Sequence, residues 1–292
     1  MISDITLGQF FPGKSPIHRL DPRTKIILAT LFIVAVFVAS NPISFLILTI
    51  TTLVLILISG ISLKIILKSI KPIIFILIFT AILNIFMTKG EPGSALVSLK
   101  VVGDWIIEIY VEGIARAAMM AFRVVILIVG TSILLTYTTS PISLTDGLEA
   151  VLSPLKKIKV PVHTFAMMMS IALRFIPTLV EETEKIMNAQ KSRGADFSSG
   201  GLVQRAKALV PLLVPLFVSS FKRAEELATA MECRCYRGDK NRTKLVKLQY
   251  KGIDVAYMIL FFILLAGLIC LTIIPYKFAS FGIIYDILFF KV

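Results

Sequence analysis

Residues 26–63 read IILATLFIVAVFVASNPISFLILTITTLVLILISGISL and hold no charged side chain. This run is too long for a single membrane span, which takes about 20 apolar residues, and it fits two short spans. Asn41 and Pro42 divide the run, because proline disfavours helix at the residue before it. The stretch therefore predicts two transmembrane helices, at residues 26–40 and 43–60.

Three further apolar stretches lie at residues 71–88, within 113–139 and at 254–274. The chain is 57% hydrophobic over 292 residues, which is more apolar than a soluble domain of this length. We therefore predict an all-α integral membrane protein with about five transmembrane helices, and a lipid bilayer around them.

Two arginines complicate the fourth span. Arg116 and Arg123 are seven residues apart and so share one face of a helix. Charge deep in lipid is costly. Either the spanning part is closer to residues 124–139, which we favour, or these arginines face the helix bundle or a protein partner.

The basic residues indicate the orientation of the chain. With the N terminus inside, the short loops and residues 137–252 place 25 of the 31 Lys and Arg residues on the cytoplasmic side. The net charge of +13 is thus explained by cations beside membrane spans, and we expect no nucleic-acid partner. We predict a multi-pass protein of the plasma membrane whose N terminus is cytoplasmic.

These stretches divide the chain into four parts. We expect a cytoplasmic N-terminal segment (1–25), transmembrane helices one to four (26–139), a cytoplasmic domain (140–252), and the last transmembrane helix with a C-terminal tail (253–292). The cytoplasmic domain should hold two to three long helices, because its apolar runs are too broken by proline and charge to be well-formed spans.

Caps and breakers mark the helices of the 140–252 domain. A short helix is expected from Pro141, a second from about Val162 to Arg193, and a third from about Leu202 to Tyr236. Gly194 suits the left-handed conformation that often follows a helix end. Internal prolines should kink or interrupt both long helices.

A weak repeat links these two long helices. Ala189 and Arg193 recur as Ala230 and Arg234 after a shift of 41 residues, and an acidic residue precedes each pair at the same shift. Arginine in a last helical turn is favoured by the helix dipole. It can also project as a planar fork of donors toward a partner. Spacing alone leaves both interpretations open.

The spans offer little for catalysis or for an ion relay. The first two hold no ionisable side chain, and Asn84 is the strongly polar residue of the third. Residues 8–15 match a phosphate-loop pattern but lack the strand and helix that such a loop joins. We expect this chain to bind no metal, nucleotide or other cofactor.

Four segments, taken together and in this order, resemble one family. They are residues 18–25 (HRLDPRTK), 173–177 (LRFIP), 189–195 (AQKSRGA) and 230–238 (AMECRCYRG). They are similar to segments of the transmembrane (T) subunits of energy-coupling factor transporters. The resemblance covers roughly residues 8–250.

The resemblance implies a non-catalytic, energy-coupling scaffold of an ATP-driven importer of a vitamin or metal ion. It would join two cytoplasmic ATPase subunits, which bind ATP and Mg, to a separate substrate-binding membrane (S) subunit. The family's ATPase contacts lie at the ends of two crossed coupling helices. By motif match these residues are Arg193 and Arg234, flanked by Ala189, Ser192, Gly194, Ala230, Cys233 and Cys235. The family more often reads Ala-Arg-Gly or Ala-Arg-Ser, so the flanks depart while the arginines stay.

Three other functions remain open at this point. A self-sufficient permease or channel would need polar side chains along its spans. A membrane enzyme would have to use Arg174, His163 and the acidic residues at 181–184. A basic patch that binds anionic lipid would explain the charge and leave the repeat unexplained.

Overall fold

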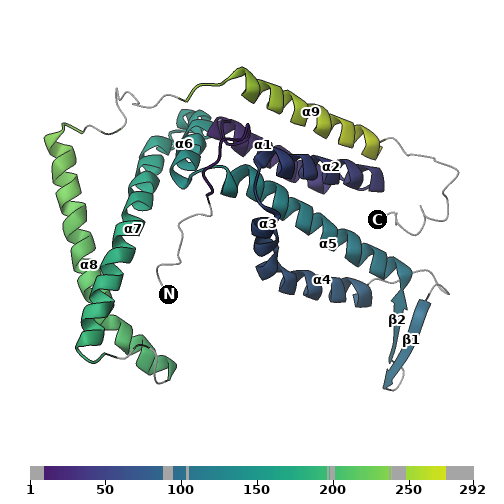
Figure 1. The fold of residues 1–292 in the computed structure, drawn as a ribbon, viewed down its shortest axis with the longest axis horizontal. Helices are drawn as coiled ribbons and strands as arrows, with labels where there is room; N and C mark the ends of the chain where they lie inside the picture. Colours follow the sequence, from purple (N-terminus) through teal and green to yellow (C-terminus); the bar gives the residue numbers. More distant parts are fainter. Residues whose placement is uncertain are drawn as a thin grey trace. The chain divides into compact units, whose positions relative to one another are not determined.

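A computed structural model describes the chain at residues 10–87, 95–102, 105–195, 197, 201–236, 238 and 248–273 (Figure 1). The chain forms two compact units. We call residues 10–140 and 248–292 the membrane unit, and residues 1–9 and 141–247 the insert unit.

The helices of the membrane unit follow the apolar stretches of the sequence. They are α1 (Pro22–Val38), α2 (Pro42–Ser59), α3 (Leu63–Ile70), α4 (Ile74–Met87), α5 (Val111–Thr131) and α9 (Gly252–Ile273). A short 3₁₀ turn joins α3 to α4, and a π-helical segment, Ser132–Tyr137, extends α5. Asn41 precedes α2 and Pro42 is its first residue, which confirms the break predicted between the first two helices.

Four helical stretches among the described residues are long and apolar enough to cross a membrane. They are Leu63–Met87, Gly113–Tyr137, Val162–Ser192 and Gly252–Ile273, and the shorter Ile43–Ser59 is also apolar. The prediction of an all-α, multi-pass membrane protein is confirmed. Val162–Ser192 was not expected among the spans, because its second half is rich in charge; its first half supplies the apolar window.

A two-stranded antiparallel hairpin departs from the all-helical prediction. Strands β1 (Ala95–Val102) and β2 (Trp105–Tyr110) pair between α4 and α5. Both strands are rich in β-branched and aromatic residues, which suit a pleated surface. The sequence between them is Gly-Asp, a pair typical of two-residue hairpin connections, so the signal was present in the sequence.

Helix α1 is the centre of the membrane unit. It packs against α9 and α5, and α1, α2, α5 and α9 lie side by side in Figure 1. Phe32 of α1 is fully buried, and Gly130 of α5 lies under its ring. A Cβ on Gly130 would come within 2.1 Å of that ring, so only glycine permits this close approach of the two helices.

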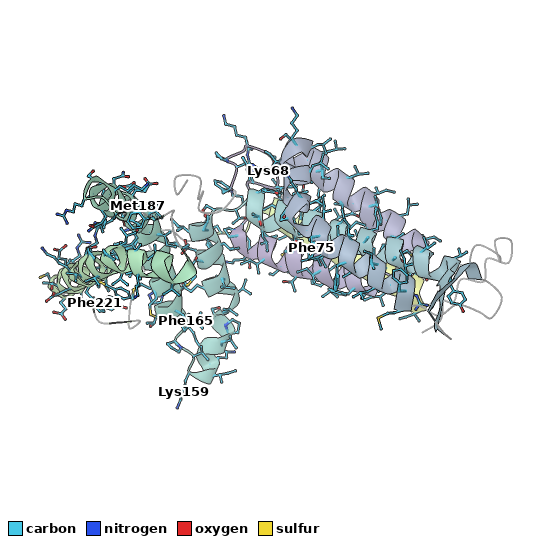
Figure 2. The ribbon with its side chains drawn as sticks, turned by 90° about the horizontal axis from the view of Figure 1, so that it is seen from below. Lys68, Phe75, Lys159, Phe165, Met187 and Phe221 are labelled. Atoms are coloured by element: carbon cyan, nitrogen blue, oxygen red, sulfur yellow. The ribbon has the colours of Figure 1, made fainter. Side chains whose placement is uncertain are left out.

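The outer surface of the membrane unit is apolar. Phe75 of α4 is 78% exposed (Figure 2), and Leu57 of α2 is 76% exposed. A soluble monomer rarely leaves such a broad apolar surface in water, whereas hydrocarbon solvates it.

Arg123 has its partners within the helix bundle. We favoured a spanning part that begins after this residue; the apolar helical stretch Gly113–Tyr137 contains it, and the point where the membrane begins stays a prediction. The Arg123 guanidinium donates to the carbonyl oxygen of Ala39 at 2.8 Å and lies 5.2 Å from the centre of the Phe45 ring. The arginine thus faces the bundle and satisfies the C-terminal end of α1, which was our second alternative.

The described residues of the insert unit form three helices and a short 3₁₀ segment. They are α6 (Pro141–Val151), a 3₁₀ segment (Ser153–Ile158), α7 (Val162–Ser192) and α8 (Leu202–Cys233). The predicted starts and ends of these helices agree closely with the structure. The expected interruption of the third helix is wrong: α8 continues through Pro211 and Pro215, and α7 continues through Pro177.

The close approach of α1 and α5 predicts opposite effects for two alanine substitutions. Gly130→Ala should destabilise the membrane unit by about 1–3 kcal/mol, because the new methyl overlaps Phe32. Gly267→Ala on α9 meets no atom within 4 Å and should be neutral or slightly stabilising. Thermal unfolding of the purified protein in detergent measures both, and equal melting temperatures would contradict the tight packing described.

Candidate functional site

The two long helices of the insert unit cross one another. Helices α7 and α8 are in contact (Figure 1), and Glu182 of α7 forms an ion pair with Arg223 of α8. These two residues are 41 positions apart, which is the shift that relates the arginine motifs. The helices therefore meet at equivalent positions of the repeat.

The predicted site residues Arg193 and Arg234 stand at matching places beyond this crossing. Each arginine follows its helix's member of the ion pair by 11 positions. At a rise of 1.5 Å per residue, each arm is about 16 Å long. Both arginines are exposed.

The end of α7 has a defined hydrogen-bond pattern. The amide of Gly194 donates to the carbonyl of Lys191 at 2.9 Å, and the amide of Ala195 donates to the carbonyl of Gln190 at 3.0 Å. Gly194 has φ of +85°, as predicted for the residue after the cap. This is the Schellman pattern, and it places Arg193 at the C-cap.

The end of α8 repeats that pattern. The amide of Cys235 donates to the carbonyl of Glu232 at 2.8 Å, and the amide of Tyr236 donates to the carbonyl of Met231 at 3.0 Å. Cys235 takes the left-handed conformation with φ of +56°. Arg234 is thus at the same cap position as Arg193, although a cysteine with a Cβ replaces glycine.

The flanking predicted residues surround these two caps on the surface. Ser192 donates through Oγ to the carbonyl of Asn188 at 3.1 Å, and Cys233 and Cys235 are exposed free thiols. Ala189 and Ala230, one turn before each arginine, are also exposed. Small side chains around an exposed guanidinium leave it accessible, and such a group can donate several hydrogen bonds to carbonyls or a carboxylate of another protein.

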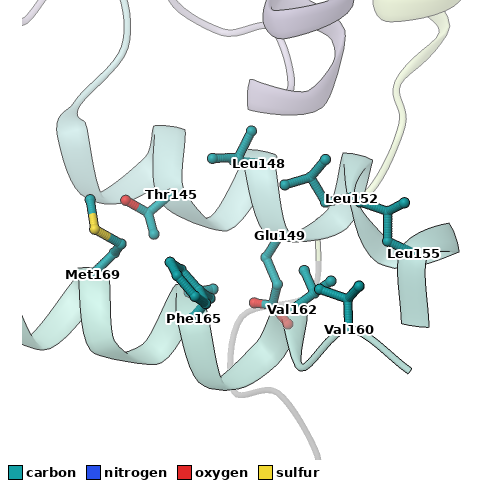
Figure 3. Close-up of a pocket in the computed structure, with 10 residues that line it drawn as sticks. Thr145, Leu148, Glu149, Leu152, Leu155, Val160, Val162, Phe165 and Met169 are labelled. Atoms are coloured by element: carbon teal, nitrogen blue, oxygen red, sulfur yellow. The ribbon is translucent and has the colours of Figure 1, made fainter. Parts of the chain in front are cut away.

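The insert unit also has an open apolar pocket of about 260 Å³ between α6, the 3₁₀ segment and α7. Figure 3 shows that Leu148, Leu152 and Leu155 line one side, and that Val160 and Phe165 are among the residues of the other. Phe165 is 62% exposed. The pocket is apolar apart from Thr145 and Glu149, so it suits an apolar partner surface better than a charged solute.

The N-terminal motif lies outside this site, in the membrane unit. The ring of His18 is 2.6 Å from Ser15 Oγ through Nδ1 and 3.0 Å from the Phe11 carbonyl oxygen through Nε2. Burial lowers the pKa of His18, the bond to Phe11 opposes that shift, and the charge of Lys25 adds to it. A neutral ring that donates from Nε2 fits these contacts, so His18 fixes the segment before α1.

The residues that an enzyme would use do not gather in one place. His163 is paired with Glu149 at 3.0 Å, and Glu182 is paired with Arg223 at the helix crossing. Within the described part of the chain, no cluster of three or more His, Cys, Asp or Glu side chains is arranged to hold a metal ion. These contacts assign His163 and Glu182 to packing of the insert unit.

Comparison with known proteins identifies the family. The family model described as "Cobalt transport protein" (CbiQ) matches residues 13–245, which is most of the chain. That stretch includes the N-terminal motif and both arginine caps. The chain belongs to this family.

Relatives across several bacteria agree in name. The energy-coupling factor transporter transmembrane protein EcfT of Acidaminococcus fermentans is 50% identical over 271 residues, 92% of this chain and 98% of the relative. EcfT of Ruminiclostridium cellulolyticum is 49% identical, with 87% and 92% covered. EcfT of Bacillus subtilis is 46% identical, with 91% and 97% covered.

This chain is therefore a T subunit, the transmembrane component of an energy-coupling factor transporter. It is a transport subunit rather than a catalytic enzyme, as its sequence predicted. The contact between its arginine caps and ATPases remains a prediction. The sequence analysis did not predict that the helices cross at Glu182 and Arg223, although the shift of 41 residues makes these two residues equivalent positions of the repeat.

The two caps predict a mirrored pair of stability effects. Cys235→Gly should stabilise the T subunit by about 1 kcal/mol, because a residue with a Cβ pays to adopt the left-handed conformation. Gly194→Cys should cost about the same, since no atom lies within 4 Å of the added Cβ and only the backbone conformation changes. Amide hydrogen exchange in the last turns of α7 and α8 reports both, and shifts of the same sign would refute the shared geometry.

Proposed function

We propose that this T subunit transmits motion between two cytoplasmic ATPase subunits and a substrate-binding membrane (S) subunit during ATP-driven import of a vitamin or metal ion. The observation that carries the proposal is the pair of matching caps. Arg193 and Arg234 are exposed, share one cap geometry, and stand at equal lengths of helix from a single crossing.

Two equivalent ends on one chain suit two partners of one kind. An ATPase pair offers a groove on each half, and a T subunit with one rigid arginine-tipped end per groove can bind both halves at once. Arginine suits this role because its planar fork bonds several acceptors and its charge is permanent. The ATP and Mg belong to the ATPases, and this chain needs no cofactor of its own.

The charge distribution supports a protein of the plasma membrane whose insert unit lies on the cytoplasmic side. Residues 137–252 hold 18 Lys or Arg and 10 Asp or Glu. Long segments count less in the positive-inside rule, but the short segments at residues 14–25 and 64–71, which hold seven Lys or Arg, indicate the same cytoplasmic side. The arginine caps would then be on the side where ATP is present.

The apolar surfaces of the insert unit support contact with the S subunit. Phe217, Val218 and Phe221 of α8 are each more than 60% exposed, and the pocket beside Phe165 is open. Water disfavours such surfaces, so a membrane partner or lipid should cover them. Met168 and Met169 of α7 are half exposed, and such adaptable side chains would tolerate more than one partner.

The membrane unit supports the assignment of cargo binding to another chain, against the alternative of a self-sufficient permease or channel. Asn84 donates to the carbonyl of Thr80 in its own helix at 2.8 Å. Thr49, Thr51 and Thr52 of α2 likewise donate to carbonyls four residues earlier. Polar groups that are satisfied within their own helices do not form a path for a polar solute.

Arg193→Ala, Arg234→Ala and the double variant test the proposal against wild type. Each single change should weaken capture of the co-expressed ATPases about tenfold, and the double change should abolish it, because two anchors are removed. Lys185→Ala, an exposed cation on α7 outside the motif, is the matched control and should bind normally. Pull-down from detergent and the ATPase rate of the assembled complex are the readouts.

The amount of T subunit in the membrane must be equal in all samples. If the double variant retains full ATPase binding, the arginines are ordinary helix-end cations and the proposed docking is refuted. If wild type binds no ATPase, the coupling function itself fails.

A further inference from the structure

The chain leaves and re-enters the membrane unit at two points. It leaves after Ser140, the last residue before α6, and it returns at Leu248, just before α9. Any covalent transmission of force between the coupling helices and the spans passes through these two crossings. What holds the crossings in the membrane unit therefore matters for coupling.

Lys25 holds the outgoing crossing. Its ammonium donates to the carbonyl oxygen of Thr138 at 2.7 Å and to that of His18 at 3.3 Å. The amide of Phe11 donates to the neighbouring carbonyl of Tyr137 at 3.0 Å. Lys25 and Phe11 thus bind the backbone of the outgoing chain, three and four residues before α6 begins.

Asp254 and Arg23 hold the incoming crossing. The Asp254 carboxylate accepts from the amide of Lys251 at 2.7 Å through Oδ2. The Arg23 guanidinium donates to the carbonyl of Leu248 at 3.3 Å and lies 5.3 Å from the centre of the Tyr250 ring. The returning segment is therefore held at Leu248 by Arg23 and at Lys251 by Asp254.

The two crossings share one polar network. The other oxygen of Asp254, Oδ1, accepts from the amide of Asp21 at 2.8 Å. Asp21 caps α1 by accepting from the amide of Arg23 at 2.9 Å, and Lys25 follows one turn later. The amide of Lys25 donates to the carbonyl of Asp21 at 3.1 Å, which joins the two halves of the network. One network thus connects Thr138 on the way out with Lys251 on the way in.

Both charged groups are almost completely buried. Lys25 is 2% exposed and Asp254 is 1% exposed. Buried charged groups contribute little net stability compared with apolar residues of similar size, so stability alone does not account for this arrangement. The side-chain hydrogen bonds of Lys25 and Asp254 all go to backbone atoms: those of Thr138 and Lys251 lie beside the crossings, and those of His18 and Asp21 lie just before α1. The network therefore links both crossings to the start of α1.

We propose that Lys25 and Asp254 are positioning residues that clamp both chain crossings to α1 and α9, so that movement of the coupling helices reaches the membrane spans. This inference rests on the proposed coupling function. The clamp consists of Lys25, Asp254, Asp21 and Arg23. It gives the N-terminal motif, residues 18–25, a mechanical role separate from ATPase or S-subunit contact.

Hydrogen exchange on the T subunit in complex with its ATPases tests the clamp, with and without a non-hydrolysable ATP analogue. The variants are Asp254→Asn, Lys25→Met and the double variant, which removes both charges and leaves no lone buried ion. The control is Asn41→Leu, because the Asn41 amide donates to the carbonyl of Leu271 at 2.7 Å at the opposite end of α9.

In wild type, the nucleotide analogue should change exchange in α7 and α8 and also at the membrane ends of α1 and α9. In the Asp254→Asn and double variants, the side chain keeps one acceptor oxygen of two, so the amide of Asp21 or that of Lys251 should lose about tenfold or more of its protection. In all three clamp variants, the nucleotide response of α7 and α8 should persist, while that of α1 and α9 should be lost. The Asn41→Leu control should keep both responses, even if its melting temperature falls.

The outcomes separate the two levels of inference. If the double variant folds and passes the nucleotide response to α1 and α9 like wild type, the clamp is refuted while the coupling function stands. If wild type shows no nucleotide response in α7 and α8, the coupling function fails first. If Asn41→Leu loses the α1 and α9 response as the clamp variants do, any loosening of α9 suffices and the specific role of the pair is refuted.

Discussion

A polar or charged group placed among apolar side chains must find a partner, and this requirement organises the membrane unit. Hydrocarbon and a dry helix bundle offer no water to replace a missing hydrogen bond. Arg123 accordingly reaches the end of α1, Asn41 reaches α9, and Asp254 satisfies two amides at once. These three side chains each fix a neighbouring segment, and the apolar packing around Phe32 and Gly130 fills the space between those fixed points.

The sequence predicted much of this fold, for identifiable reasons. Long uncharged runs and a single Asn-Pro break were enough to place α1 and α2, since length and proline act locally. Gly194 likewise predicted the end of α7, because the conformation of glycine at a helix end is a local property. The partner of Arg123 was not predicted, because it is 84 residues away and no local pattern reports it. The hairpin was not predicted, because its two strands are much shorter than the apolar runs that mark transmembrane helices.

The candidate site shows the same division between local and distant information. Motif match singled out Arg193 and Arg234, and the structure gives both the same cap. The left-handed Cys235 was not foreseen, because cysteine carries no preference for that conformation. The role of the N-terminal motif was equally hidden, since the groups that it binds come from residues more than a hundred positions later. Sequence spacing can single out a candidate residue, whereas only the structure identifies the distant residue that it contacts.

The equal arms of α7 and α8 have a geometric consequence of their own. If two rigid helices rotate about the partly buried Glu182–Arg223 pair, each tip moves in proportion to its distance from that pair. With arms of about 16 Å, a change of about 20° in the direction of one helix displaces its tip by ~5 Å. A modest rotation at the pair thus becomes a stroke as long as a turn of helix at each arginine, and equal arm lengths give both tips strokes of the same size.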